Sequence, residues 1–232
     1  MIISDYLSKK LKFFSLFLTV LVVFIHTYKE HVVFGIFPQG DPIAYLMFYI
    51  SAGICNIAVP LFFAISGFLF FKGNPVFTFN DYRTTVSKRI FTLLTPYLLV
   101  SLISIILHFI AGLTEESRNL FLEGREVHLG IADFFKTWFV QPWAYHLWFI
   151  RNLMILCILT PVIYFLTKKL GYFFIVPLFF VWLVSSSILP AFSTSFVFFS
   201  IGAFLSIKEV NFPVNKKIIY PILGIPLWLI LI

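Results

Sequence analysis

The stretch IFTLLTPYLLVSLISIILHFIAG, residues 90–112, decides the fold class, because it is a long apolar run with no acidic residue, lysine or arginine. About 20 mostly apolar residues are enough for a helix to cross the hydrocarbon core of a bilayer. Comparable runs occupy most of the remaining chain: 11–28, 45–71, 146–167, 172–190, 194–207 and 218–232. The sequence therefore predicts an all-α, polytopic transmembrane helical bundle with seven visible spans.

Composition supports this fold class. Hydrophobic residues make up 60% of the 232 residues and charged residues 12%, against about a quarter charged in an ordinary soluble domain. The 32 phenylalanines are spread along the whole chain, so apolar surface must face lipid as well as neighbouring helices. With no internal repeat or linker, we expect one domain over residues 1–232.

The net charge of +7 does not indicate nucleic-acid binding, because the basic residues fall in short clusters between apolar runs. Alternate loops place 12 of the 17 lysines and arginines on one side, which the positive-inside rule assigns to the cytoplasm together with the N-terminus. These residues are Lys9, Lys10, Lys12, Lys72, Arg83, Lys88, Arg89, Lys168, Lys169, Lys208, Lys216 and Lys217.

Two further features concern the loop 113–145 and the cysteines. Residues 130–139 have the pattern of an amphipathic helix lying at the membrane interface, with Trp138 and Trp143 at headgroup depth. Cys55 and Cys157 lie within apolar runs without metal-ligand spacing, so we expect buried free thiols and no metal site.

Ionisable residues inside apolar runs are functional candidates, since burying them in a membrane is costly. His26 closes the first run and can serve as a general base, or it can simply bond a carbonyl at the interface. Arg151 can hold a partner anion or extend to the outer headgroups. For His108 and His146 we expect structural roles.

On the predicted inner side, Arg83, Lys88 and Arg89 form a basic cluster just before the run 90–112. Such a cluster can bind anionic lipid or the phosphates of a cytoplasmic donor. Within the second run, Pro60, Ser66 and Gly67 can open a path between helices or serve helix packing.

Five segments, in order along the chain, resemble the acyltransferase 3 family of membrane-bound acyltransferases. They are VVFIH (22–26), VPLFFAISGFLF (59–70), KRIFTLLTPY (88–97), LWFIRNL (147–153) and SFVFFSIGAFL (195–205). The resemblance implies transfer of an acyl group, commonly acetyl, from cytoplasmic acyl-CoA to a hydroxyl of an extracytoplasmic surface glycan or lipid-linked sugar. It also implies a multi-pass protein of a bacterial cytoplasmic membrane, with about ten spans and no bound cofactor, so that the last spans are missing here.

The resemblance assigns roles to particular residues. His26 matches the family's histidine in the first span and would act as base or proton relay, while Lys88 and Arg89 would bind the donor's phosphates. One position departs from the family pattern: many members carry an arginine eleven residues before that histidine, where this chain has Ser15. Either Arg151 or Lys12 replaces that charge, or the donor is bound differently, or activity is lost.

Two other classes of function use the same polar residues. A transporter or glycan-export component would need the cavity without a covalent step, and a catalytically inactive subunit would explain Ser15. Transporters often show repeat symmetry between their halves. The sequence shows none, which favours the enzyme.

Overall fold

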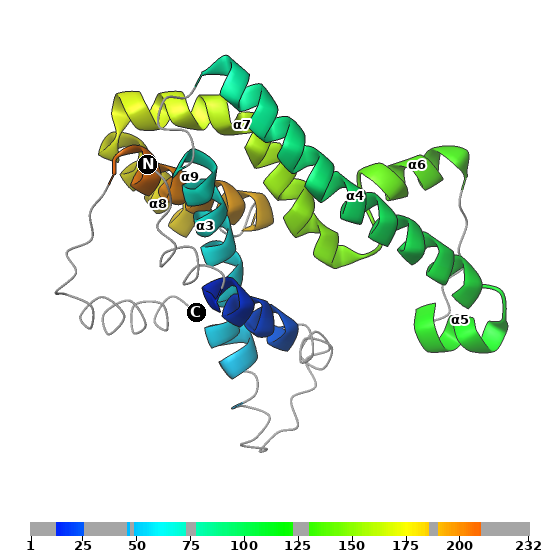
Figure 1. Cartoon of the computed structure of the whole chain (residues 1–232). Coiled ribbons are helices and arrows are strands. Elements are labelled where there is room, and N and C mark those ends of the chain that lie inside the picture. The colour runs from blue at the N-terminus through cyan, green and yellow to red at the C-terminus, as the bar shows by residue number, and fades with distance from the viewer. Residues whose placement is uncertain are drawn as a thin grey trace. The chain divides into compact units, whose positions relative to one another are not determined.

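The structure is a computed structural model that describes residues 13–25, 46, 49–72, 78–122, 130–185 and 190–209. All regular elements in these ranges are helical, which confirms the all-α prediction (Figure 1). The helices, in order, are Phe13–Ile25, η1 (Tyr49–Ile54), η2 (Cys55–Ile57), α3 (Ala58–Lys72), α4 (Phe79–Ala111), α5 (Glu115–Leu122), α6 (Ile131–Phe139), η3 (Tyr145–Leu147), α7 (Trp148–Leu170), α8 (Tyr172–Ser185) and α9 (Pro190–Ile207).

Three of the described helical segments are long and apolar enough to cross a membrane: Tyr49–Lys72, Phe79–Ala111 and Trp148–Leu170. Shorter apolar helices, Phe13–Ile25, Tyr172–Val184 and Phe192–Ile207, fall within three further predicted runs. The run 218–232 lies outside the described residues. The count of seven spans therefore stays a prediction.

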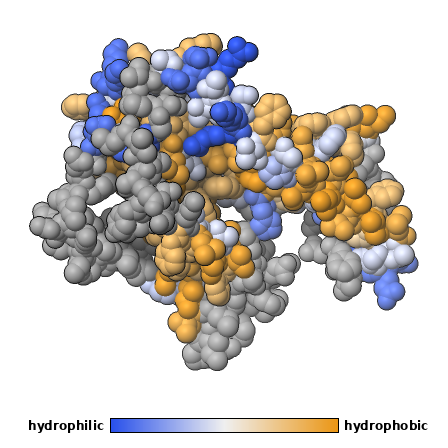
Figure 2. Space-filling model, viewed as in Figure 1, coloured by the Kyte–Doolittle hydropathy of each residue, from blue (hydrophilic) through white to orange (hydrophobic). Residues whose placement is uncertain are grey.

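Large apolar side chains remain uncovered on the described helices. On α4, Phe91 is 71% exposed and Leu107 is 59% exposed, and on α8 Phe173 is 86% exposed. Figure 2 shows apolar residues over much of the visible surface of α4. Contiguous apolar surface on this scale marks contact with lipid or with other protein, which fits a membrane protein.

The chain forms two compact units, and the first comprises residues 1–77 and 162–232. Its centre is the contact between α3 and α9. A Cβ atom added at Gly67 would overlap the backbone carbonyl of Phe199, and one added at Gly202 would overlap the carbonyl of Ala64. Gly67 thus serves helix packing, because only a residue without a side chain lets the two backbones approach this closely.

Basic residues end several helices of the first unit. Phe71 of α3, next to Lys72 in sequence, stacks on Tyr164 of α7 with a centroid distance of 6.0 Å, and Lys168 Nζ donates to the Tyr164 hydroxyl at 3.3 Å. The Nζ of Lys208 donates to the Lys168 carbonyl at 3.4 Å. The contacts therefore gather at one end of this unit three lysines that the sequence assigns to one side of the membrane.

The second unit comprises residues 78–161, from the start of α4 to Pro161 within α7. Here the helix α4 begins earlier than the apolar run that predicted it. Thr78 caps the helix by accepting from the Asp81 backbone N–H at 3.2 Å, and Asp81 lies in the first turn, where its charge favours the helix dipole. The basic cluster is consequently part of α4 and does not precede it.

The predicted helix at 130–139 is present as α6, and it packs along α4. The indole Nε1 of Trp138 donates to the Leu98 carbonyl at 3.1 Å. Trp143 lies against the His108 ring with a centroid distance of 4.7 Å. These contacts determine where the candidate site residues of this unit lie.

Candidate functional site

Arg89 of α4 faces the neighbouring helix α7. Its side chain is half-buried and hydrogen-bonded to the side chain of Cys157, which is fully buried. Cys55 is also buried, so the predicted burial of both thiols is confirmed. Of the three predicted basic residues, Arg89 is the one directed into the protein.

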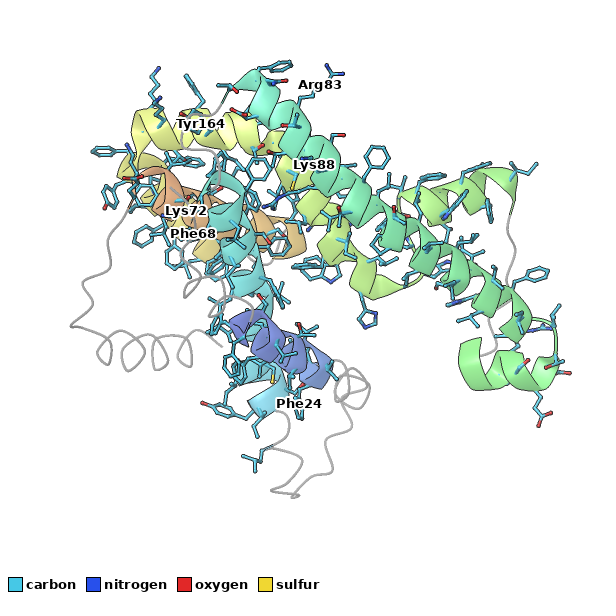
Figure 3. All side chains as sticks on the ribbon, in the orientation of Figure 1. Phe24, Phe68, Lys72, Arg83, Lys88 and Tyr164 are labelled. Atoms are coloured by element: carbon cyan, nitrogen blue, oxygen red, sulfur yellow. The ribbon has the colours of Figure 1, made fainter. Side chains whose placement is uncertain are left out.

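Arg83 and Lys88 differ from Arg89 in being exposed on α4 (Figure 3). The nearby Tyr82 hydroxyl donates to the Ile158 carbonyl at 3.0 Å and fixes the start of α4 against α7. The predicted basic cluster is therefore divided: two cations point outward from α4, and one joins the contact between α4 and α7.

Arg151 lies in the first turns of α7 and is half-buried. Its Nη1 donates to the Val140 carbonyl at 2.8 Å, and its positive charge interacts with the Tyr97 hydroxyl of α4. Arg151 therefore does not simply extend away from the protein. A guanidinium has five N–H donors, so Arg151 can hold this carbonyl and still bind a carboxylate, phosphate or thioester oxygen.

Arg89 and Arg151 lie on the same pair of helices without meeting. Arg89 bonds Cys157 of α7, whereas Arg151 is itself a residue of α7. Positions 151 and 157 are six residues apart, which is about 9 Å along a helix. The structure thus places two guanidinium groups at successive levels between α4 and α7.

His26, the predicted catalytic base, lies outside the described residues. The helix that precedes it is described, and Ser51 of η1 donates its hydroxyl to the Phe24 carbonyl at 3.3 Å. Ser15, at the position where the family carries arginine, has its backbone carbonyl bonded by the Thr19 hydroxyl at 2.9 Å. The described part of this helix contains no lysine or arginine that replaces the missing charge.

The other two histidines considered from the sequence lie in the second unit. Nδ1 of His108 donates to the Ser104 carbonyl one turn earlier at 2.8 Å, as expected of a structural histidine. His146 is exposed in η3, immediately before α7. Within the described ranges, no group of three or more histidine, cysteine, aspartate or glutamate side chains is arranged to hold a metal ion.

Sequence reasoning missed Tyr97 and Ser101 in this region, and it placed Trp138 at headgroup depth without identifying its partner. Each bonds a backbone carbonyl of the neighbouring helix, at 3.1 Å for Tyr97 to Phe139, 3.0 Å for Ser101 to Trp138, and 3.1 Å for Trp138 to Leu98. The available signal was the presence of Tyr97 and Ser101 inside an otherwise apolar run. A polar group at such a position needs a partner, but the sequence does not say which one.

Comparison with known proteins yields one match that covers nearly the whole chain. A family model described as an acyltransferase domain matches residues 15–232. No curated protein and no solved structure matches. The matched range includes Ser15, the apolar helices and every predicted site residue, and on this basis the chain belongs to the acyltransferase 3 family.

Proposed function

We propose that this membrane acyltransferase moves an acyl group, most simply acetyl, from cytoplasmic acyl-CoA to a hydroxyl of an extracytoplasmic or lipid-linked carbohydrate. The observation that carries the proposal is the family match over residues 15–232, on a chain whose described residues include three helices long and apolar enough to cross a membrane. The donor, the acyl group and the acceptor are part of the proposal.

In the proposed reaction, the His26 imidazole takes the proton of the acceptor hydroxyl as its oxygen attacks the thioester carbon. A carbon–oxygen bond forms, the carbon–sulfur bond breaks, and the electron pair of that bond leaves on the CoA sulfur. The proton passes from the imidazolium to the thiolate, so that an ester and free CoA result and the histidine is regenerated.

For the donor we assign the phosphates to Lys88 and Arg83, and we assign Arg89 to the contact between α4 and α7. The exposure of the first two on α4 supports this, because a soluble donor must reach them from water. Arg89 is already bonded to Cys157 and is better placed to fix α4 against α7. Cationic side chains bind phosphate through charge-assisted hydrogen bonds.

The direct test replaces His26 with Ala in the native cells and measures the acyl content of the surface glycan. We expect acylation to be lost while the amount of protein in the membrane is unchanged. His108→Ala is the matched control, since this histidine bonds the Ser104 carbonyl of its own helix and packs against the Trp143 ring. Normal acylation in the His26→Ala cells would exclude the catalytic role.

A second test addresses the donor. We expect Lys88→Ala combined with Arg83→Ala to raise the KM for acyl-CoA at least tenfold and to change kcat much less. Lys169→Ala is the control, because that lysine lies over the Phe165 ring of its own helix at 5.5 Å. Equal KM values in the double variant and the control would contradict the assignment.

A further inference from the structure

The last carbonyl groups of α6 are bonded by side chains of neighbouring elements. Ser101 Oγ donates to the carbonyls of Thr137 and Trp138 at 3.3 and 3.0 Å, and the Tyr97 hydroxyl donates to that of Phe139 at 3.1 Å. Arg151 donates to that of Val140 at 2.8 Å. Three side chains therefore donate to four successive carbonyls at the end of α6, and the single Ser101 hydroxyl is shared between two of them.

The four bonds at the end of α6 range from buried to exposed: that of Ser101 to Thr137 is buried, those to Trp138 and Phe139 are partly buried, and that of Arg151 to Val140 is exposed at the protein surface. Tyr97 is 1% exposed, Ser101 is 0% exposed and Thr137 is 8% exposed. The final carbonyls of a helix lack partners within the helix, and at a water interface solvent bonds them. In hydrocarbon every such group needs a partner from the protein. The side chains around α6 give its final carbonyls protein partners, as a helix end in hydrocarbon requires. An interfacial helix does not require them, because water can bond its final carbonyls.

The position of the contact along α4 gives its depth. The uncharged part of α4 runs from Ile90 to Ala111, about 32 Å at 1.5 Å per residue, which matches the hydrocarbon thickness. Leu98 and Ser101 lie about 12 and 16 Å from its inner end. The end of α6 thus meets α4 near the middle of its apolar length, although the sequence pattern predicted an interfacial helix.

The beginning of α7 meets α4 at the same level. Arg151 bonds the Val140 carbonyl, which follows directly after the Phe139 carbonyl bonded by Tyr97 of α4, and η3 leads directly into α7. Residues 140–147, which include Pro142, connect the end of α6 to the start of α7. Non-helical backbone at membrane depth is tolerated where protein side chains surround it or where it lines a water-filled cavity.

We propose that α6 and α7 form one interrupted membrane segment, in which α6 re-enters the bilayer and ends near its middle, and that Arg151 is the positioning residue that holds the break at that depth. The charge of Arg151 is used to bond a carbonyl within the membrane. Figure 1 shows α6 alongside the middle part of α4, as this arrangement requires.

A crosslinking experiment tests the contact itself. In the full chain with Cys55 and Cys157 changed to Ala, the pair Ser101→Cys and Trp138→Cys is oxidised in native membranes. We expect a disulfide in most molecules, and none in the control pair Ala111→Cys and Trp138→Cys, because position 111 lies about 15 Å further along α4. A disulfide in the control pair, or none in the first pair at normal protein levels, would overturn the proposal.

A depth measurement tests the membrane position and the role of Arg151. Nitroxide labels at residues 130 and 140, one per protein, are compared for exposure to oxygen and to a water-soluble nickel complex. The proposal predicts that residue 140 lies at least about 10 Å deeper than residue 130. Equal depths would overturn it, whether or not acyl transfer is observed.

The same labels separate positioning by Arg151 from general stability. We expect Arg151→Ala to bring the label at residue 140 closer to water, and Arg151→Lys to restore most of the depth, since an ammonium can still donate to the Val140 carbonyl. An unchanged depth in Arg151→Ala would contradict the positioning role.

Discussion

The two compact units hold their helices together by different means. In the first unit, α3 and α9 meet backbone to backbone at Gly67 and Gly202, where no side chain fits. In the second, α4, α6 and α7 are joined by hydrogen bonds from Tyr97, Ser101, Trp138 and Arg151 to carbonyls of neighbouring elements. Membrane helices associate by both routes, since lipid offers apolar side chains no advantage for burial. The first route fixes a rigid pair, and the second fixes irregular backbone.

The largest effect is expected at the glycine contact. Gly202→Ala should destabilise the protein by about 3 kcal/mol, because the new methyl group overlaps the Ala64 carbonyl and the helices must separate. Thermal unfolding in detergent measures the change. Gly130→Ala is the control, since its methyl group would meet only the end of the Asp133 side chain, at 3.3 Å. Equal losses in both variants would contradict the backbone contact.

A smaller effect is expected at the polar contact. Ser101→Ala removes the donor to the Thr137 and Trp138 carbonyls and should cost about 2 kcal/mol, because buried carbonyls lose a partner. Ser104→Ala, one turn further along α4, should change stability by less than about 0.5 kcal/mol. The same unfolding assay compares the two variants. If Ser104→Ala lowered stability as much as Ser101→Ala, the hydrogen bonds of Ser101 would not explain the loss.

The contact between α8 and α9 combines features of both units. Trp182 Nε1 donates to the Thr194 hydroxyl at 2.9 Å, and its ring packs edge-on to Phe198. Trp182→Phe keeps most of the ring contact and should cost about 0.6 kcal/mol, the average for such bonds in membranes. In a double-mutant cycle, Thr194→Val should cost less when Trp182 is already Phe. Strict additivity would show that the bond contributes nothing.

The smallest effect is expected in the other direction. Thr167 is fully buried, and its hydroxyl has no hydrogen-bond partner among the residues that the structure describes. Thr167→Val should leave stability unchanged or raise it by up to about 1 kcal/mol, because an unsatisfied polar group is removed. Thr160→Val is the matched comparison on α7, since the Thr160 hydroxyl bonds the Cys157 carbonyl at 2.7 Å. A larger loss from Thr167→Val than from Thr160→Val would indicate a partner for Thr167.

The helical fold could be predicted because apolar runs such as 90–112 are longer than the apolar stretch of a helix in a soluble protein. The helix at 131–139 could be predicted from its amphipathic pattern. The depth of α6 could not be predicted, because an interfacial helix and a re-entrant helix have the same two-sided sequence pattern. They differ in which groups bond the final carbonyls of the helix. Those partners, Tyr97 and Ser101, lie about forty residues earlier in the chain.

The candidate site was predictable in part. The cost of charge in a membrane singled out Arg151, and the basic cluster before the run 90–112 included Arg89. Both make contacts inside the second unit. The division of the basic cluster was not predictable, because it depends on which face of α4 meets α7. Arg83 and Lys88 lie on exposed positions of that helix, whereas Arg89 does not.

The most direct measurement offers radiolabelled acetyl-CoA to inverted membrane vesicles, so that the donor meets only the cytoplasmic face, and follows the label into the glycan fraction. We expect labelled glycan with the native protein and none with His26→Ala, while both proteins are present at equal levels. Absence of label in the native vesicles, with acceptor glycan present, would contradict acyl transfer from acetyl-CoA and favour a transport role.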